Sequence, residues 1–301
     1  MTLVMEAINS LSTLYRVAYE HKELRDEYIE FLNEIFSEGL GTAYGVKGFT
    51  QYQKDALKEI LFGDDEVNVL LWSRQVGKTT MMSVFALLYV FTQYPNKVEV
   101  LVIAPTLRQS SNLFDRITTA LDIFAGYYHA VKPTRTGYDP ELVKTKTRTL
   151  VEFTWGSVIR CLPSKNVRGF SPSLILIDES AFMPEASWQE ILPMLKAKKT
   201  AKMKLVLTST PFGTTGRFYD FWMKSRQGYP FHITYKDCPF ADKEAIEKEL
   251  SEGLMSQEEW RREYLAEFVP SAGSAIPEDL IMKAIEDYET FSDRELGVAG
   301  Y

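Results

Sequence analysis

The stretch Leu70-Leu71-Trp72-Ser73-Arg74-Gln75-Val76-Gly77-Lys78-Thr79-Thr80 decides the fold of this chain. The apolar residues that lead into it from Val67 predict a buried strand. Residues 79–94 contain neither Gly nor Pro and are rich in Leu, Met, Phe and Ala, which predicts a packed helix. A polar turn between a buried strand and a helix is the setting of a phosphate-binding loop.

The chemistry of this loop follows from a helix that begins near Lys78. The first backbone N–H groups of such a helix have no partner within it and can bind an anionic polyphosphate. Lys78 supplies a cation for the β- and γ-phosphates, and the Thr79 hydroxyl can ligate the Mg²⁺ that bridges them. One residue departs from the usual G-x-x-x-x-G-K-[ST] pattern, because Trp72 stands where the first glycine is expected. The predicted nucleotide-binding residues of the loop are Ser73, Arg74, Gln75, Val76, Gly77, Lys78, Thr79 and Thr80.

A second stretch, Leu174-Ile175-Leu176-Ile177-Asp178-Glu179-Ser180, predicts a strand that ends in two carboxylates. Its consecutive aliphatic residues are typical of a strand buried on both faces of a parallel sheet. Ligands bind at the carboxyl edge of such sheets, where the phosphate loop also opens. We therefore expect Asp178 to hold Mg²⁺ and Glu179 to orient and polarise the attacking water.

Two further segments extend the predicted site. The buried strand from Met203 ends in Thr208, Ser209 and Thr210, whose hydroxyls can contact a γ-phosphate or the water beside it. The alternative is a polar strand end that enters a turn. Upstream of the loop, Tyr52 can stack on adenine and the Gln53 amide can bond the edge of the base. The alternative for Tyr52 is packing in the face of its helix.

Composition indicates an ordinary globular chain. Its 301 residues are 45% hydrophobic and 25% charged, and the net charge of −7 argues against a basic coat over the whole protein. No stretch is long and apolar enough to span a bilayer, and the N-terminus has no secretory pattern. The two cysteines, Cys161 and Cys238, lie far apart and without metal-ligand spacing, which favours a reduced intracellular chain.

Three regions are predicted along the chain: a helical accessory region at 1–48, an ATPase core with a small C-terminal helical subdomain at 49–269, and a linker with a further segment at 270–301. Glycines from Gly39 to Gly48 predict a loop-rich joint. Residues 149–153 and 157–162 predict a hairpin. Alternating Lys144, Lys146 and Arg148 are either a solvated face or a DNA contact, and the same choice holds for the lysines of 196–204.

In this order the motifs resemble those of the ATPase domain of the large terminase subunit of tailed bacteriophages, over roughly residues 50–270. Ser73 to Thr80 is similar to the family's arginine-containing Walker A variant, which accounts for the missing glycine. Leu174 to Glu179 resembles the Walker B strand with its catalytic glutamate. Thr208–Thr210 resembles the coupling motif and Tyr52–Gln53 the adenine motif. Arg168 matches the family's arginine finger, which acts on the site of a neighbouring subunit. The alternative is that Arg74 is the finger and acts in its own site.

The resemblance implies a RecA-like P-loop ATPase of the ASCE type, an α/β fold with a mostly parallel central sheet flanked by helices. It implies Mg²⁺-dependent ATP hydrolysis that drives double-stranded DNA into the prohead. The implied partners are the DNA, the portal protein, the small terminase subunit and further copies in a ring on the portal, with no membrane. The implied location is the host cell cytoplasm, at the portal vertex of the prohead during packaging.

Large terminases usually carry a nuclease domain after the linker. Because residues 295–301 are too few for that domain, we expect an ATPase fragment without nuclease activity. Two alternatives share these motifs. A helicase-like nucleic-acid remodeller would contain a second RecA-like domain, for which too few residues follow Thr210. A nucleotide-dependent assembly module would not need a catalytic glutamate, so Glu179 weighs against it.

Overall fold

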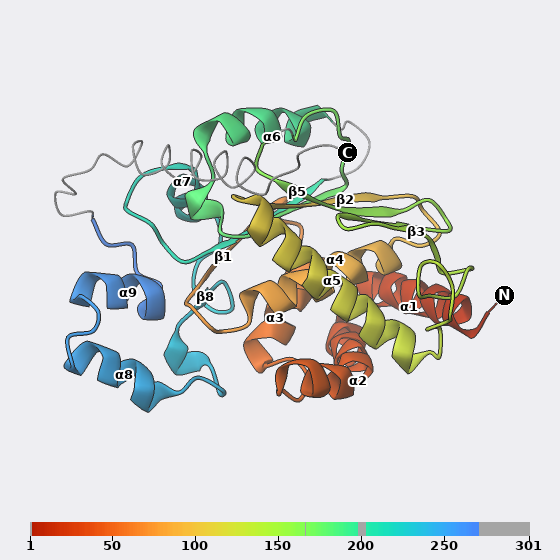
Figure 1. Ribbon diagram of the computed structural model, residues 1–301, viewed down its shortest axis with the longest axis horizontal. Coiled ribbons are helices and arrows are strands. Elements are labelled where there is room, and N and C mark those ends of the chain that lie inside the picture. The colour runs from red at the N-terminus through yellow and green to blue at the C-terminus, as the bar shows by residue number, and fades with distance from the viewer. Residues whose placement is uncertain (1, 166, 198–202, 271–301) are drawn as a thin grey trace, which may run out of the picture.

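The computed structural model describes residues 2–165, 167–197 and 203–270, and its centre is a mixed eight-stranded sheet (Figure 1). The strand order is β3-β4-β5-β2-β6-β7-β1-β8. The strands are β1 (Val67–Trp72), β2 (Glu99–Ala104), β3 (Val143–Lys146), β4 (Leu150–Phe153), β5 (Val158–Pro163), β6 (Leu174–Ile177), β7 (Lys204–Ser209) and β8 (His232–Ile233).

The topology explains why the sequence motifs meet. Strand β7 pairs in parallel with β1 on one side and with β6 on the other. The strand that ends in hydroxyls therefore lies between the phosphate-loop strand and the carboxylate strand, and all three end at the same edge. Strands β4 and β5 pair antiparallel, which confirms the predicted hairpin, and β3 pairs antiparallel with β4 at the edge of the sheet. The predicted α/β fold with a mostly parallel central sheet is confirmed.

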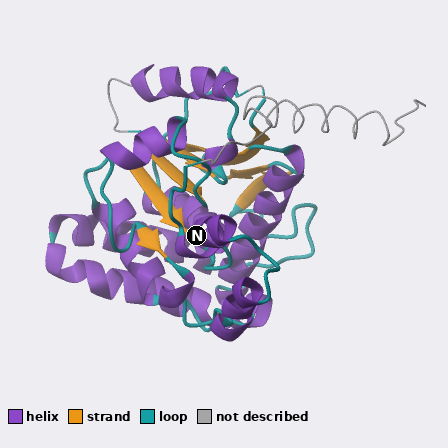
Figure 2. Ribbon diagram, turned by 90° about the vertical axis from the view of Figure 1, so that its left-hand side faces the viewer, coloured by secondary structure: helices purple, strands orange, loops and turns teal. Residues whose placement is uncertain are grey.

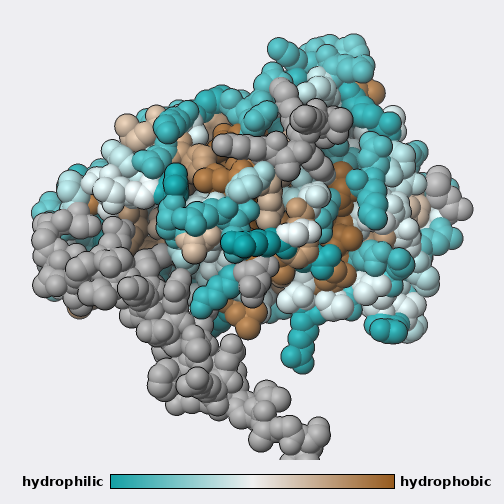
Figure 3. Space-filling view, turned by 90° about the horizontal axis from the view of Figure 1, so that it is seen from above, coloured by the Kyte–Doolittle hydropathy of each residue, from teal (hydrophilic) through white to brown (hydrophobic). Residues whose placement is uncertain are grey.

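Helices cover both faces of the sheet, as the view of Figure 2 shows. In Figure 1, α6 and α7 lie above the sheet and α1 to α5 below it. Seen from above, brown hydrophobic areas alternate with teal hydrophilic ones on the described surface (Figure 3). The helices are α1 (Leu3–Glu20), α2 (Arg25–Tyr44), α3 (Gln51–Phe62), α4 (Lys78–Thr92), α5 (Leu107–Tyr127), α6 (Glu185–Ala197), α7 (Arg217–Lys224), α8 (Lys243–Ser251) and α9 (Gln257–Leu265), with short 3₁₀ turns η1 (Lys22–Leu24), η2 (Ser180–Phe182) and η3 (Tyr235–Asp237).

The predicted start of the loop-rich joint at Gly39 was wrong, because α2 continues through Gly39 and Gly41 to Tyr44. A Cβ atom at Gly39 would lie 2.4 Å from the Cγ2 atom of Ile123 on α5. The glycine thus permits the close approach of two helices rather than ending one. Gly45 then ends α2 in the left-handed conformation, with φ of 72°.

The N-terminal helices share the main hydrophobic core, to which α1 and α2 contribute buried residues such as Ile8, Leu32 and Phe36. A separate small cluster of Tyr235, Ile246, Trp260 and Tyr264 holds α8 and α9 together. No helix in the described ranges is long and apolar enough to cross a membrane. The segment 271–301 and the lysine-rich residues 198–202 lie outside the described residues, and the proposed division into three regions stays a prediction.

Candidate active site

The phosphate loop joins β1 to α4 through a backbone that only glycine suits at one position. Gly77 is the N-cap of α4 and has φ of 82°. A Cβ atom there would be 2.6 Å from Nε2 of Gln53. Gln75 also has positive φ, at 64°. The left-handed conformation therefore favours glycine at position 77, and a larger residue there would also displace the Gln53 amide.

Trp72 explains why the first glycine of the usual pattern is dispensable here. It is the last residue of β1, and its indole is fully buried. The indole Nε1 donates a hydrogen bond of 2.9 Å to the carbonyl of Pro230, and the ring meets Tyr52 edge-on with centroids 5.2 Å apart. The side chain therefore belongs to the core beneath the loop and leaves the space above the loop open.

Lys78 is held against the loop itself. Its side chain is only 7% exposed, and Nζ donates hydrogen bonds of 3.0 Å to the carbonyl oxygens of Trp72 and Ser73. No carboxylate forms an ion pair with it among the residues that the structure describes. A charged phosphate is a stronger acceptor than these two carbonyls, so Lys78 is available to an anionic ligand.

The carboxylate of Asp178 connects the phosphate loop, the end of β6 and the end of β7. Its Oδ2 atom accepts from the Thr79 hydroxyl at 3.1 Å, and its Oδ1 atom accepts from the Thr208 hydroxyl at 2.7 Å. Oxygen ligands at adjacent corners of a Mg²⁺ octahedron are about 2.9 Å apart, given Mg–O distances of 2.0–2.1 Å. The spacing of the Thr79 and Asp178 oxygens therefore fits one shared divalent ion.

Glu179 lies beside this network in an unusual backbone conformation. It has φ of 51°, in the left-handed region, and its Oε2 atom accepts from the Ser209 hydroxyl at 3.2 Å. The pKa of Glu179 is raised to about 7, chiefly by burial; the Lys78 ammonium opposes this shift and the nearby Asp178 carboxylate adds to it. A carboxylate that titrates near neutral pH is suited to exchange a proton with a bound water.

A cavity of about 340 Å³ opens in front of the loop and is lined by Lys78, Thr79, Glu179 and Arg74, among others. Its far wall is apolar and comes from the end of α2 and the segment after it, with Leu40, Tyr44, Val46 and Phe49, and from Phe240. The polar end suits phosphates and the apolar end suits a nucleobase.

Arg116 on α5 also lines this cavity, and no sequence pattern predicts it there. Its Nη1 atom donates to the hydroxyl of Thr80 at 3.1 Å, and its guanidinium lies 5.3 Å from the ring centroid of Tyr44. An arginine within an amphipathic helix has no local pattern that distinguishes it from a solvated one. Only the packing of α5 against α2 and α4 brings it to the site.

Of the two adenine-motif residues, Tyr52 lies differently from expectation. Tyr52 is 3% exposed, and its hydroxyl donates to the carbonyl of Val76 at 2.8 Å. This is the packing alternative, and it differs from the open ring that stacking on adenine requires. Gln53 caps α3 with its Oε1 atom and lies 3.4 Å from the carbonyl of Gly77 with Nε2, at the wall of the cavity.

The two candidate finger arginines occupy different places. Arg74 is exposed at the cavity, and its backbone N–H donates to the carbonyl of Glu263 at 2.7 Å. Arg168 does not line the cavity; its side chain is 80% exposed, with Nε 2.8 Å from Oε1 of Glu190 on α6. Thr210 is buried at the end of β7.

Comparisons with known proteins identify the family and the fold. Residues 69–283 match the family described as terminase large subunit, T4likevirus-type, N-terminal. The large terminase ATPase domain of Thermus phage P74-26 is 22% identical, with a TM-score of 0.59 over 78% of this chain and 97% of that one. The HK97 bacteriophage large terminase is 15% identical, with a TM-score of 0.56 over 74% of this chain and 51% of that one.

A third similar structure is the large terminase of the thermophilic bacteriophage D6E in complex with ATP-gamma-S. It is 17% identical, with a TM-score of 0.53 over 73% of this chain and 53% of that one. At these identities the likeness establishes the fold. The chain spans about half the length of the HK97 and D6E proteins.

Proposed function

The chain belongs to the family of large terminase subunits of the T4-like type, and from this premise we propose that it hydrolyses ATP with Mg²⁺ to drive double-stranded DNA into a viral prohead. The observation that carries the proposal is the hydrogen-bonded network at the edge of the sheet. It unites Thr79 of the phosphate loop, Asp178 after β6 and Thr208 of β7 within hydrogen-bond distance. A nucleotide-binding site that only bound its ligand would not need a buried Glu179 beside this network.

The residues divide into binding and hydrolytic roles. The loop N–H groups and Lys78 bind the β- and γ-phosphates. Thr79 and Asp178 would hold Mg²⁺, which would neutralise charge on the phosphates. Glu179 accepts a hydrogen bond from the attacking water and orients it toward the γ-phosphorus. Ser209 fixes the Glu179 carboxylate, because its hydroxyl donates to Oε2 at 3.2 Å.

The cavity walls assign the rest of the nucleotide. We place the base against the apolar wall of Tyr44, Val46 and Phe49, with the Gln53 amide at its edge and Tyr52 beneath the loop as a support. Arg74 offsets negative charge in its own cavity. Arg168 points to solvent and serves the site of a neighbouring subunit in the ring.

The hydroxyls of β7 supply a route from hydrolysis to movement. Thr208 bonds Asp178 and Ser209 bonds Glu179, so a change of charge or position at either carboxylate alters the end of β7. The chain continues from there through residues 210–216 to α7. The partners of this motor are the DNA, the portal protein and the small terminase subunit, in the host cytoplasm.

The test is the variant Glu179→Gln, assayed for phosphate release with and without DNA and for binding of ATP-gamma-S. General-base catalysis contributes about 10²–10⁴-fold, so turnover should fall by that factor while analogue binding is retained. The exposed Glu244→Gln in α8 is the matched control and should behave as the wild type. A Glu179→Gln protein that turns over normally contradicts the proposal, and wild-type binding without any phosphate release favours the assembly module.

A further inference from the structure

A groove separate from the nucleotide cavity lies beside β3, at the edge of the sheet; we call it the hairpin groove. Residues of β3, the loop before it and the β4–β5 turn enclose a hollow of about 400 Å³. Its lining contains three cationic side chains and four threonine hydroxyls, and no carboxylate. The lining residues are Thr134, Arg135, Thr136, Pro140, Val143, Lys144, Thr145, Lys146 and Thr154. In a chain with a net charge of −7, such a lining is a local excess of positive charge.

The cations of this hairpin groove are exposed and largely unopposed. Lys144 and Lys146 are both solvent-exposed on β3, as their alternation predicted. Arg135 in the lining is exposed, as are Lys132 and Arg148 close to it in sequence. None of the three forms an ion pair with any residue in the described part of the chain.

The carboxylates on the segments around the groove do not line it. Glu152 pairs with Lys144 at 2.7 Å. Glu141 accepts from the backbone N–H of Thr2 at 3.1 Å, and buried Asp139 accepts from the backbone N–H of Glu141 at 2.9 Å. Lys146 donates to the Tyr138 hydroxyl at 3.1 Å, and that hydroxyl donates to Asp122 on α5. Glu152 offsets the charge of Lys144, but the lining itself contains only cationic charges.

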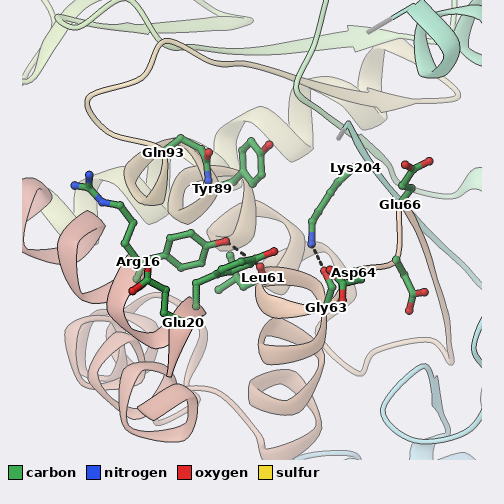
Figure 4. A pocket seen from close by; sticks show the side chains of 12 residues that line it. Arg16, Glu20, Leu61, Gly63, Asp64, Glu66, Tyr89, Gln93 and Lys204 are labelled. Atoms are coloured by element: carbon green, nitrogen blue, oxygen red, sulfur yellow. Dashed lines mark hydrogen bonds between the residues drawn. The ribbon is translucent and has the colours of Figure 1, made fainter. Parts of the chain in front are cut away.

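A second cavity of similar size shows that this lining is not a general feature of the surface. The cavity of about 350 Å³ between α1, α3 and the start of β7 contains Lys204 (Figure 4). The Nζ atom of Lys204 donates to the carbonyl of Gly63 at 2.9 Å, near the end of α3. The same cavity is lined by four carboxylates, those of Glu20, Asp64, Asp65 and Glu66, against two cations. Such a mixed lining does not select an anion.

We propose that the hairpin groove binds the phosphate backbone of double-stranded DNA. Lysine, arginine and threonine hydroxyls are the groups that contact phosphate oxygens and position a protein on a duplex without reading its sequence. Single strands are usually bound by aromatic side chains on which bases stack, and no aromatic residue lines this groove. A motor that moves along DNA of any sequence requires contacts of the backbone kind. This inference rests on the proposed function, because it assigns the surface that the translocated DNA touches.

The test is equilibrium binding of a short fluorescent duplex by the whole 301-residue chain, without nucleotide, over a series of salt concentrations. The test variant is the double charge reversal Arg135→Glu and Lys144→Glu. The matched control is Lys22→Glu with Lys248→Glu. Like Arg135, Lys22 is exposed and without an ion pair in the described ranges, and like Lys144, Lys248 pairs with a nearby carboxylate, Glu252 at 3.4 Å.

The test variant should bind the duplex at least about tenfold more weakly. The negative slope of log affinity against log salt should become shallower by about 2, since each lost phosphate contact removes roughly 0.9 from its magnitude. The control should keep the wild-type affinity and slope. Basal phosphate release without DNA should be unchanged in both, which separates this inference from the proposed ATPase. The proposal is overturned if the test variant binds the duplex as tightly as the wild type, or if the control loses as much affinity as the test variant. It is also overturned if polyglutamate competes for the protein as well as unlabelled duplex does.

Discussion

The nucleotide cavity and the hairpin groove are both lined by lysine, arginine and threonine, but they hold these groups in different ways. In the cavity, Lys78 is buried and bonded to two backbone carbonyls, the Thr79 hydroxyl bonds to Asp178, and the Thr80 hydroxyl accepts from Arg116. In the groove, Arg135 and Lys144 are exposed, and the carboxylates beside them are engaged elsewhere or in surface pairs.

The difference separates two kinds of recognition. A fixed network of charges in a partly closed site distinguishes one ligand from another and supports chemistry, because the groups do not need to reorganise during the reaction. Exposed cations supply a salt-dependent attraction that is indifferent to sequence. The same residue types can therefore serve hydrolysis at the carboxyl ends of the central strands and DNA contact at the edge strand β3.

The largest expected effect compares one lysine from each region. Lys78→Ala should weaken binding of ATP-gamma-S by at least about tenfold, since a charge-assisted hydrogen bond contributes about 1.5–3 kcal/mol and 1.4 kcal/mol is a factor of ten. Lys144→Ala should leave that affinity unchanged. Isothermal titration calorimetry of both variants measures the difference, and equal affinities in the two would remove the distinction between the regions.

A smaller effect concerns the pH dependence of hydrolysis. Because the pKa of Glu179 is raised to about 7, its carboxylate takes up a proton as the pH falls through that value, and the attacking water loses its acceptor. Between pH 6 and pH 8 the turnover rate should therefore rise by about tenfold. DNA binding at the groove, which no carboxylate lines, should change little over the same range. Persistence of the same rise in the residual activity of Glu179→Gln would show that another group titrates.

The smallest expected effect compares two buried tyrosines, one beneath each region. Tyr52 supports the phosphate loop through Val76, and Tyr138 supports the groove through Lys146 and Asp122. Each change to Phe should cost about 1 kcal/mol of stability. Tyr52→Phe should weaken analogue binding alone, and Tyr138→Phe should weaken duplex binding alone. Thermal melts with the two binding assays measure this, and a variant that weakens both would mean that the regions are coupled.

Much of the site could be predicted because its residues follow buried strands. The apolar runs before Ser73, Asp178 and Thr208 each indicate a core strand, and polar residues at the ends of parallel strands converge at one edge. The alternation of Lys144 and Lys146 likewise gave one exposed face of β3. These signals are local, and the sheet brings them together.

What could not be predicted depends on contacts between distant segments. The apolar wall of the cavity comes from the end of α2, in a region that we expected to be an accessory. The run of glycines predicts a loop at Gly39, because nothing in the sequence indicates its contact with Ile123. The motif predicts a ligand role for Tyr52, because nothing local indicates that Trp72 fills the core beside it.

The most direct test of the account is a structure of this chain with Mg²⁺ and a slowly hydrolysed ATP analogue. It should place the base against Tyr44, with Lys78 released from the carbonyls of Trp72 and Ser73 and bound to the β- and γ-phosphates. Glu179 should face the γ-phosphate across a water, with Arg74 at the phosphates and Arg168 outside the cavity of its own subunit. A nucleotide bound elsewhere, or bound here with Glu179 turned away from the γ-phosphate, would contradict the central claim.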